Sequence, residues 1–202
     1  QLLSAVGSLL GPKPHVVLDE KRHGLKIWPL VVGSTATGRK GTGAGRVFGL
    51  LDEVDPAWTL RRRSGIASGE AIVHHVRDEV VRRKRTKGAD GAVQETAEVT
   101  EGEPDKRLFL KEEEFSRVLR IARKEGTTIS ATIREAWDSD VLMTTAKTHP
   151  ETATGAHVVI LGHITPEELL RGIGETELSG GFVNRFLLVS SRRSKRTPQP
   201  PA

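Results

Sequence analysis

Short apolar runs alternate with amphipathic segments along this chain, and the alternation predicts an α/β domain. The runs that we expect to form buried strands span residues 27–32, 107–110, 156–161 and 186–190, with a further short strand at 141–144. Apolar side chains at helical spacing predict helices over residues 2–10, 46–53, 71–81, 115–124 and 130–137, and another that starts at 165–168. Strands that are apolar throughout are typical of a parallel sheet covered by helices on both faces.

The pattern of apolar and polar residues also predicts where the folded domain begins and ends. Residues 86–105 are rich in Gly, Glu, Thr and Ala and have almost no large apolar side chains. Such a segment cannot bury enough surface to order itself, so we expect a flexible insertion. We expect a helix end and linker over 1–24, one folded domain over 25–190 and a basic, Pro-rich tail over 191–202. Because the chain begins with Gln, we also expect it to be a fragment or an internal domain of a longer protein.

The amino-acid composition excludes several kinds of protein and site. With 202 residues, the chain is long enough for one α/β domain with a sizeable core. It has no Cys, which excludes a disulfide framework and a thiolate metal site, and we expect a reducing, cytoplasmic location. No apolar run approaches the roughly 20 residues of a membrane span, so we expect no membrane partner.

Positive charge is concentrated in three clusters. The net charge is +5, and the clusters lie at 61–63, 82–85 and 192–196. Basic clusters attract nucleic acid by neutralising phosphates and releasing counterions, although a charge run is also commonly a solvated face. The chain has no Tyr and only five Phe, so it gives no evident platform for base stacking.

A glycine-rich loop follows the first expected strand. The loop spans residues 33–42 and leads into an apolar stretch that we expect to be helical. A strand, a glycine loop and a helix together form a phosphate cradle, because backbone N–H groups and the positive end of the helix point at the ligand. Gly33 and Gly38 have the spacing of the first and second glycines in the P-loop pattern G-x-x-x-x-G-K-[ST].

The residues after the second glycine depart from that pattern. Arg39 stands where Lys is expected, Lys40 where Ser or Thr is expected, and Thr42 comes two residues late, after Gly41. A slip of one residue would bring Lys40 to the β- and γ-phosphates and Thr42 to Mg²⁺. Alternatively Arg39 takes the phosphate role, although its planar fork is a poor substitute for a lysine. The third possibility is a surface loop with incidental cations.

Other candidate residues lie at the ends of later strands. In a parallel sheet, ligands bind at the carboxyl ends of the strands. Glu112 is the candidate for the Mg²⁺ side and Glu113 for the attacking water, although Lys111 interrupts the apolar run, and acids are favoured at a helix start anyway. His163 could sense the γ-phosphate or be a structural histidine.

Two further residues have open roles. Arg185 follows a glycine turn, so it could reach a neighbour's phosphate as an arginine finger or pair with a local carboxylate. Glu70 follows a second glycine-containing turn and could cap a helix or act as an alternative catalytic base.

Five motifs, in this order and spacing, resemble one family. They are GSTATGRKGT at 33–42, SGIASGE at 64–70, EEEFSRVL at 112–119, LGHITPEEL at 161–169 and GFVNRF at 181–186. The chain, from about residue 25 to 189, resembles uncharacterised RecA-like P-loop ATPase domains of phage, plasmid and actinobacterial proteins. These domains are often joined to primase–polymerase modules and are similar to hexameric replicative helicases.

The resemblance implies a RecA-like P-loop NTPase with a mostly parallel central sheet flanked by helices. It further implies ATP and Mg²⁺ as cofactors, assembly into a homo-oligomeric ring such as a hexamer, and translocation on single-stranded DNA. By resemblance, Lys40 and Thr42 belong to the phosphate loop, Glu112 and Glu113 to the acidic strand end, His163 to the sensor and Arg185 to the finger. Two functions stay open: a helicase-like ATPase of replication or mobile-element maintenance, and a degenerate P-loop module that binds nucleotide or DNA without turnover.

Overall fold

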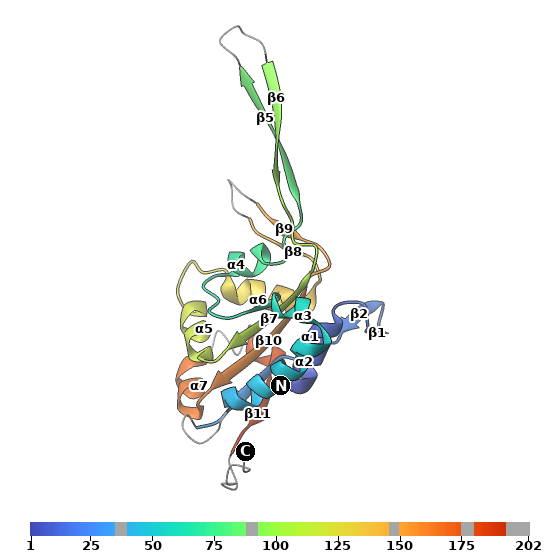
Figure 1. Cartoon of the computed structure of the whole chain (residues 1–202). Helices are drawn as coiled ribbons and strands as arrows, with labels where there is room; N and C mark the ends of the chain where they lie inside the picture. The colour runs from blue at the N-terminus through green and yellow to red at the C-terminus, as the bar shows by residue number, and fades with distance from the viewer. Residues whose placement is uncertain (35–39, 88–92, 146–149, 175–179, 193–202) are drawn as a thin grey trace.

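A five-stranded parallel sheet forms the centre of the molecule in the computed structural model (Figure 1). Its strands follow the order β11-β3-β10-β7-β4, and each neighbouring pair runs parallel. They span Pro29–Val32 (β3), Arg62–Arg63 (β4), Arg107–Glu112 (β7), His157–Ile164 (β10) and Leu187–Ser190 (β11). The structure describes residues 1–34, 40–87, 93–145, 150–174 and 180–192. The expected mixed α/β class is confirmed, and the architecture is compatible with a Rossmann-like or RecA-like fold.

Helices cover both faces of this sheet. On one face lie α1 (Leu2–Leu10) and α2 (Lys40–Val54); on the other lie α5 (Phe115–Ala122), α6 (Ile129–Asp138) and α7 (Pro166–Gly172). Gly162 and His163 are consecutive in β10 and therefore point to opposite faces. An added Cβ at Gly162 would meet Phe115 of α5, whereas the His163 ring contacts Gln1 beside α1. Shorter helices span Pro56–Thr59 (α3), Gly69–His74 (α4) and Val183–Arg185 (η1).

Aromatic side chains fill the core on both sides of the sheet. Trp28 packs edge-on against Trp137 with the ring centroids 5.0 Å apart, and Trp58 packs against Phe109 at 5.5 Å. The indole N–H of Trp28 donates to the carbonyl oxygen of Val158 at 2.9 Å. The large apolar rings are therefore buried without leaving this polar group unpaired.

Helix α1 belongs to the core rather than to a linker. Its buried residues are small, with Ser4 and Ala5 almost fully covered, while Leu2 and Leu3 are exposed. Small side chains let the helix approach closely: an added Cβ at Gly7 would lie 2.1 Å from the carbonyl oxygen of Leu25. The expectation of a helix over 2–10 is confirmed, but this part of 1–24 packs on the sheet.

Three antiparallel hairpins extend from the domain in the described residues. They pair His15–Leu18 (β1) with Lys21–Gly24 (β2), Val80–Lys87 (β5) with Val93–Thr100 (β6), and Leu142–Met143 (β8) with Thr152–Ala153 (β9). The first hairpin is not expected from the sequence; it turns through Asp19 and Glu20, which both have positive φ.

The hairpin β5–β6 overturns two expectations. The helix expected over 71–81 ends at His74, and the apolar pair Val80-Val81 begins a strand instead. The insertion expected to lack order over 86–105 contains β6 at 93–100. Backbone pairing with β5 orders this segment, so it does not need the buried apolar surface that its composition lacks.

Candidate functional site

The five parallel strands all end at one edge of the sheet, called here the carboxyl-end edge. Gly33 follows β3 there, and its N–H donates to the carbonyl oxygen of Ile164 in β10 at 3.0 Å. An added Cβ at Gly33 would lie 2.5 Å from the carbonyl oxygen of Ser191, which follows β11. Close packing of three strand exits therefore already requires glycine at this position.

Helix α2 starts at this edge. Lys40 is its first residue, and Gly41 and Thr42 follow in the first turn, where Thr42 is exposed. The first turn has no acidic residue, so no side chain of that turn neutralises the positive end of the helix. Gly38, Arg39 and the side chain of Lys40 lie outside the described part of the structure.

Glu113, the residue after β7, lies beside the start of α2. A Cβ added to Gly41 would be 3.3 Å from Oε1 of Glu113. The same oxygen lies 2.7 Å from Nζ of Lys111, and the Glu113 side chain is 59% exposed. The hydrogen bond and charge of Lys111 hold the pKa of Glu113 below its usual value, with a smaller contribution from His163. A carboxylate that stays ionised thus stands next to a helix N-terminus whose first turn has no acidic residue.

Glu112 points away from this position. Its side chain is only 4% exposed, and Oε1 accepts the N–H of Ile66 at 2.9 Å. Its other oxygen, Oε2, lies 3.4 Å from a guanidinium nitrogen of Arg117. One oxygen thus holds the turn after β4 and the other pairs with α5, which favours a positioning role over contact with a metal ion.

His163 is buried on the same face as Glu113. Nε2 of the ring lies 3.0 Å from the side-chain nitrogen of Gln1, whose N–H can donate to it. The ring is near enough to influence the pKa of Glu113. The structure therefore places Glu113 beside Gly41, with His163 on the same face of the sheet.

Glu70 and Arg185 do not join this group. Glu70 lies in the first turn of α4 and accepts a hydrogen bond from Oγ1 of Thr128 at 2.9 Å. Its own backbone N–H lowers its pKa, as expected of a helix-start carboxylate. Arg185 lies just before β11, so it is at the opposite, amino-end edge of the sheet. There it donates to Gly181 O at 2.6 Å and pairs with Asp138.

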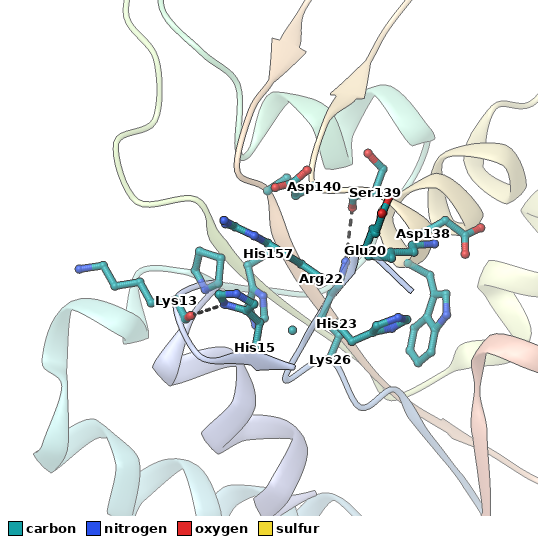
Figure 2. A pocket seen from close by; sticks show the side chains of 15 residues that line it. Lys13, His15, Glu20, Arg22, His23, Lys26, Asp138, Ser139, Asp140 and His157 are labelled. Atoms are coloured by element: carbon teal, nitrogen blue, oxygen red, sulfur yellow. Dashed lines mark hydrogen bonds between the residues drawn. The ribbon is translucent and has the colours of Figure 1, made fainter. Parts of the chain in front are cut away.

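A large cavity also lies at the amino-end edge, apart from the predicted residues. It has a volume of about 660 Å³ and lies between the β1–β2 hairpin and the end of α6. Figure 2 shows His157 of β10 among its lining residues, with Lys26 donating to the carbonyl oxygen of Ser139 at 3.3 Å. Its side chains carry both signs of charge, and several already serve local contacts.

Comparison with protein-family models and with curated proteins finds no match to this chain. In the described residues, no group of three or more His, Asp and Glu side chains is arranged to hold a metal ion. Across that same part of the chain, every helix is too short or too polar to cross a membrane.

The partners of Glu112 and Glu113 are not evident from the sequence. Lys111 is expected only to interrupt an apolar run, yet it pairs with Glu113. The sequence also gives no indication that Arg117 and the backbone of Ile66 are partners of Glu112. Strand periodicity contains part of the missing signal: Lys111 and Glu112 are consecutive in β7, so their side chains point to opposite faces of the sheet.

Proposed function

We propose that this chain is an ATP-binding, Mg²⁺-dependent ATPase domain of a DNA helicase-like or translocase-like motor that acts in replication or mobile-element maintenance. The observation that carries the proposal is the proximity of the start of α2, at Gly41, to Glu113 at the end of β7. A glycine loop, a helix start and a strand-end carboxylate are the parts that phosphoryl transfer to water requires.

The chemistry follows from these positions. The loop over 33–42 and the start of α2 would hold the phosphates through backbone N–H groups, with Lys40 adding a full positive charge. Thr42 is exposed in the first turn and has a hydroxyl suited to Mg²⁺, while bound ATP would supply the phosphoryl group. Glu113 would orient or deprotonate the attacking water, and His163, whose charge helps to lower the pKa of Glu113, would sense the γ-phosphate.

The position of Arg185 limits which nucleotide site it could serve. Arg185 lies at the amino-end edge of the sheet, so it cannot reach phosphates at the carboxyl-end edge of its own chain. An arginine finger from this residue therefore requires a neighbouring copy, as in a homo-oligomeric ring. Single-stranded DNA as the track rests on the family resemblance.

A degenerate module that binds nucleotide without turnover is the second candidate. The pair Lys111–Glu113 favours it, because a lysine 2.7 Å away partly neutralises the carboxylate proposed to activate water. The two candidates differ in turnover and agree in nucleotide binding.

ATP binding and hydrolysis, each measured with and without single-stranded DNA, test the proposal. We expect saturable Mg²⁺-dependent ATP binding and DNA-stimulated hydrolysis, both lost in Lys40→Ala. Lys13→Ala, which removes a lysine near the distant β1–β2 hairpin, is the matched control and should retain both. Binding without hydrolysis would favour the degenerate module, and no binding by the wild-type protein would reject both candidates.

A further inference from the structure

A two-stranded ribbon stands out from the domain. Strands β5 and β6 pair antiparallel over eight residues each, from Val80 opposite Thr100 to Lys87 opposite Val93. Figure 1 shows that the ribbon extends well beyond the sheet and its helices. Eight residues at about 3.3 Å per residue give a ribbon about 26 Å long.

The base of the ribbon is fixed to the domain by a compact set of contacts. The carboxylate of Asp78 accepts from Nζ of Lys106 at 2.6 Å and from the N–H of Thr154 at 3.0 Å. Gly102 follows β6, and an added Cβ there would lie 2.3 Å from the backbone nitrogen of Glu79, which precedes β5. The two segments therefore need glycine to approach this closely. The ribbon is therefore held firmly at its root.

The ribbon contributes little to the core where its side chains are described. Val81 and Val99 face each other across it and remain 55% and 53% exposed. An isolated two-stranded hairpin is marginally stable in water. A structure that anchors such a ribbon and leaves even its valines exposed provides a surface for a partner.

The charge of the ribbon points to the partner's chemistry. Strand β5 has the sequence VVRRKRTK with five basic residues, and β6 has the sequence VQETAEVT with two acidic residues. The ribbon therefore has an excess of three positive charges, which favours a polyanionic partner. Neither strand contains an aromatic residue, so the ribbon lacks the stacking side chains by which proteins hold single-stranded bases.

We propose that the β5–β6 ribbon binds duplex DNA, sequence-independently, through the phosphates that border the major groove. The major groove of B-form DNA admits a two-stranded β-ribbon, and cations along the ribbon gain affinity by releasing counterions. This surface is separate from the proposed nucleotide site, so its binding needs no ATP. It also differs from the single-stranded track expected from the family resemblance.

Binding of the full chain to a labelled 30-base-pair duplex, without nucleotide and over a range of salt concentrations, tests the proposal. In the variant Arg83→Gln/Lys84→Gln/Arg85→Gln, we expect duplex affinity at about 0.1 M salt to fall at least tenfold. We also expect the salt slope to flatten by about 0.9 for each phosphate that the variant no longer neutralises. The matched control, Lys13→Gln/Lys21→Gln/Arg22→Gln, removes three cations in or beside the exposed β1–β2 hairpin and should change neither quantity.

A second variant changes the ribbon in the opposite direction. Glu95→Gln/Glu98→Gln removes both carboxylates from β6 and should raise duplex affinity several-fold, a gain that misfolding cannot mimic. Tighter binding to a single strand than to the duplex, or equal decreases in duplex affinity in the two triple variants, would overturn the proposal. ATP binding measured in parallel separates this outcome from failure of the nucleotide site.

Discussion

The two edges of the central sheet use their charged side chains differently. At the amino-end edge, Arg107 donates to Asp55, Asp105 and the carbonyl oxygen of Leu9, so one guanidinium joins three segments. At the carboxyl-end edge, Glu113 pairs with its near neighbour Lys111, remains more than half exposed and stands beside the start of α2. Arg107 thus holds the fold together at the first edge, whereas the carboxylate of Glu113 at the second edge remains largely exposed to solvent.

The carboxyl end of α6 and the start of α2 differ in the same way. Lys26 lies at the end of α6. Its ammonium group donates to the carbonyl oxygens of Ala136 and Ser139, at 2.9 and 3.3 Å, and thereby caps the carboxyl end of α6. A cation is favoured there by the helix dipole. Burial lowers the pKa of Lys26. The negative end of α6 is thus satisfied within the chain, while the first turn of α2 has no acidic residue to compensate its positive end.

The largest expected effect separates the two neighbouring glutamates. Glu113→Gln should lower ATP hydrolysis by on the order of a hundredfold, because general-base catalysis contributes that much or more, and should leave stability unchanged. Glu112→Gln should lower the free energy of unfolding by about 1–2 kcal/mol, because it weakens the buried hydrogen bond from Ile66 and the partly buried one from Arg117. Steady-state hydrolysis and urea unfolding of both variants measure the two effects.

The opposite result in the two variants would exchange the roles of Glu112 and Glu113. If Glu112→Gln abolished hydrolysis at unchanged stability while Glu113→Gln remained active, Glu112 would be the functional carboxylate. Loss of hydrolysis with unchanged ATP binding in Glu113→Gln would assign the defect to the chemical step.

The sheet is largely predictable from the sequence because its strands are defined by local composition. Continuous apolar runs such as 158–161 become fully buried strands wherever helices cover both faces, and β10 is buried throughout. The β5–β6 ribbon is not predictable in this way, because its order comes from cross-strand pairing and from the Asp78–Lys106 contact, which composition does not reveal. Short apolar runs such as Val80-Val81 fit a helix or a strand equally well until pairing decides between them.

The candidate site is only partly predictable for a related reason. Parallel topology correctly brings the glycine-loop strand, Glu113 and His163 to one edge. Which glutamate faces that edge depends on side-chain direction, and Lys111 changes the charge around Glu113. The roles of Gly38 and Arg39 stay predictions, since both lie outside the described residues.

A smaller effect is expected at the amino-end edge, where His157 should make the free energy of unfolding depend on pH. His157 is almost fully buried, and its Nε2 lies 3.0 Å from the carbonyl oxygen of Gly7. Burial lowers the pKa of His157 to about 4, so the unfolded chain takes up a proton first as the pH falls below about 6.5. The contribution of His157 to the free energy of unfolding is therefore complete above that pH and is lost as the pH falls toward 4. At pH 5 the loss is about 2 kcal/mol.

Urea unfolding at pH 7 and pH 5 measures this dependence. His157→Gln keeps a donor near Gly7 O and should remove most of the decline in stability between the two pH values. His23→Gln, in the exposed β2 strand, is the matched control and should behave as wild type at both pH values. An unchanged pH dependence in His157→Gln would mean that other groups control acid stability.

The smallest expected change in stability is at the Arg185–Asp138 pair. Asp138→Asn should lower the free energy of unfolding by about 0.5 kcal/mol, because the Asp138 side chain is 47% exposed and solvent screens the pair. If Arg185 also completes the site of a neighbouring copy, Arg185→Gln should lower DNA-stimulated hydrolysis at least tenfold while Asp138→Asn retains it. Mixing Arg185→Gln with Lys40→Ala should then restore hydrolysis, because some mixed interfaces combine an intact Lys40 from one copy with an intact Arg185 from the next. Equal hydrolysis in Arg185→Gln and Asp138→Asn would assign the arginine wholly to the fold, since both variants break the same ion pair and only Asp138→Asn keeps a guanidinium that could reach another chain.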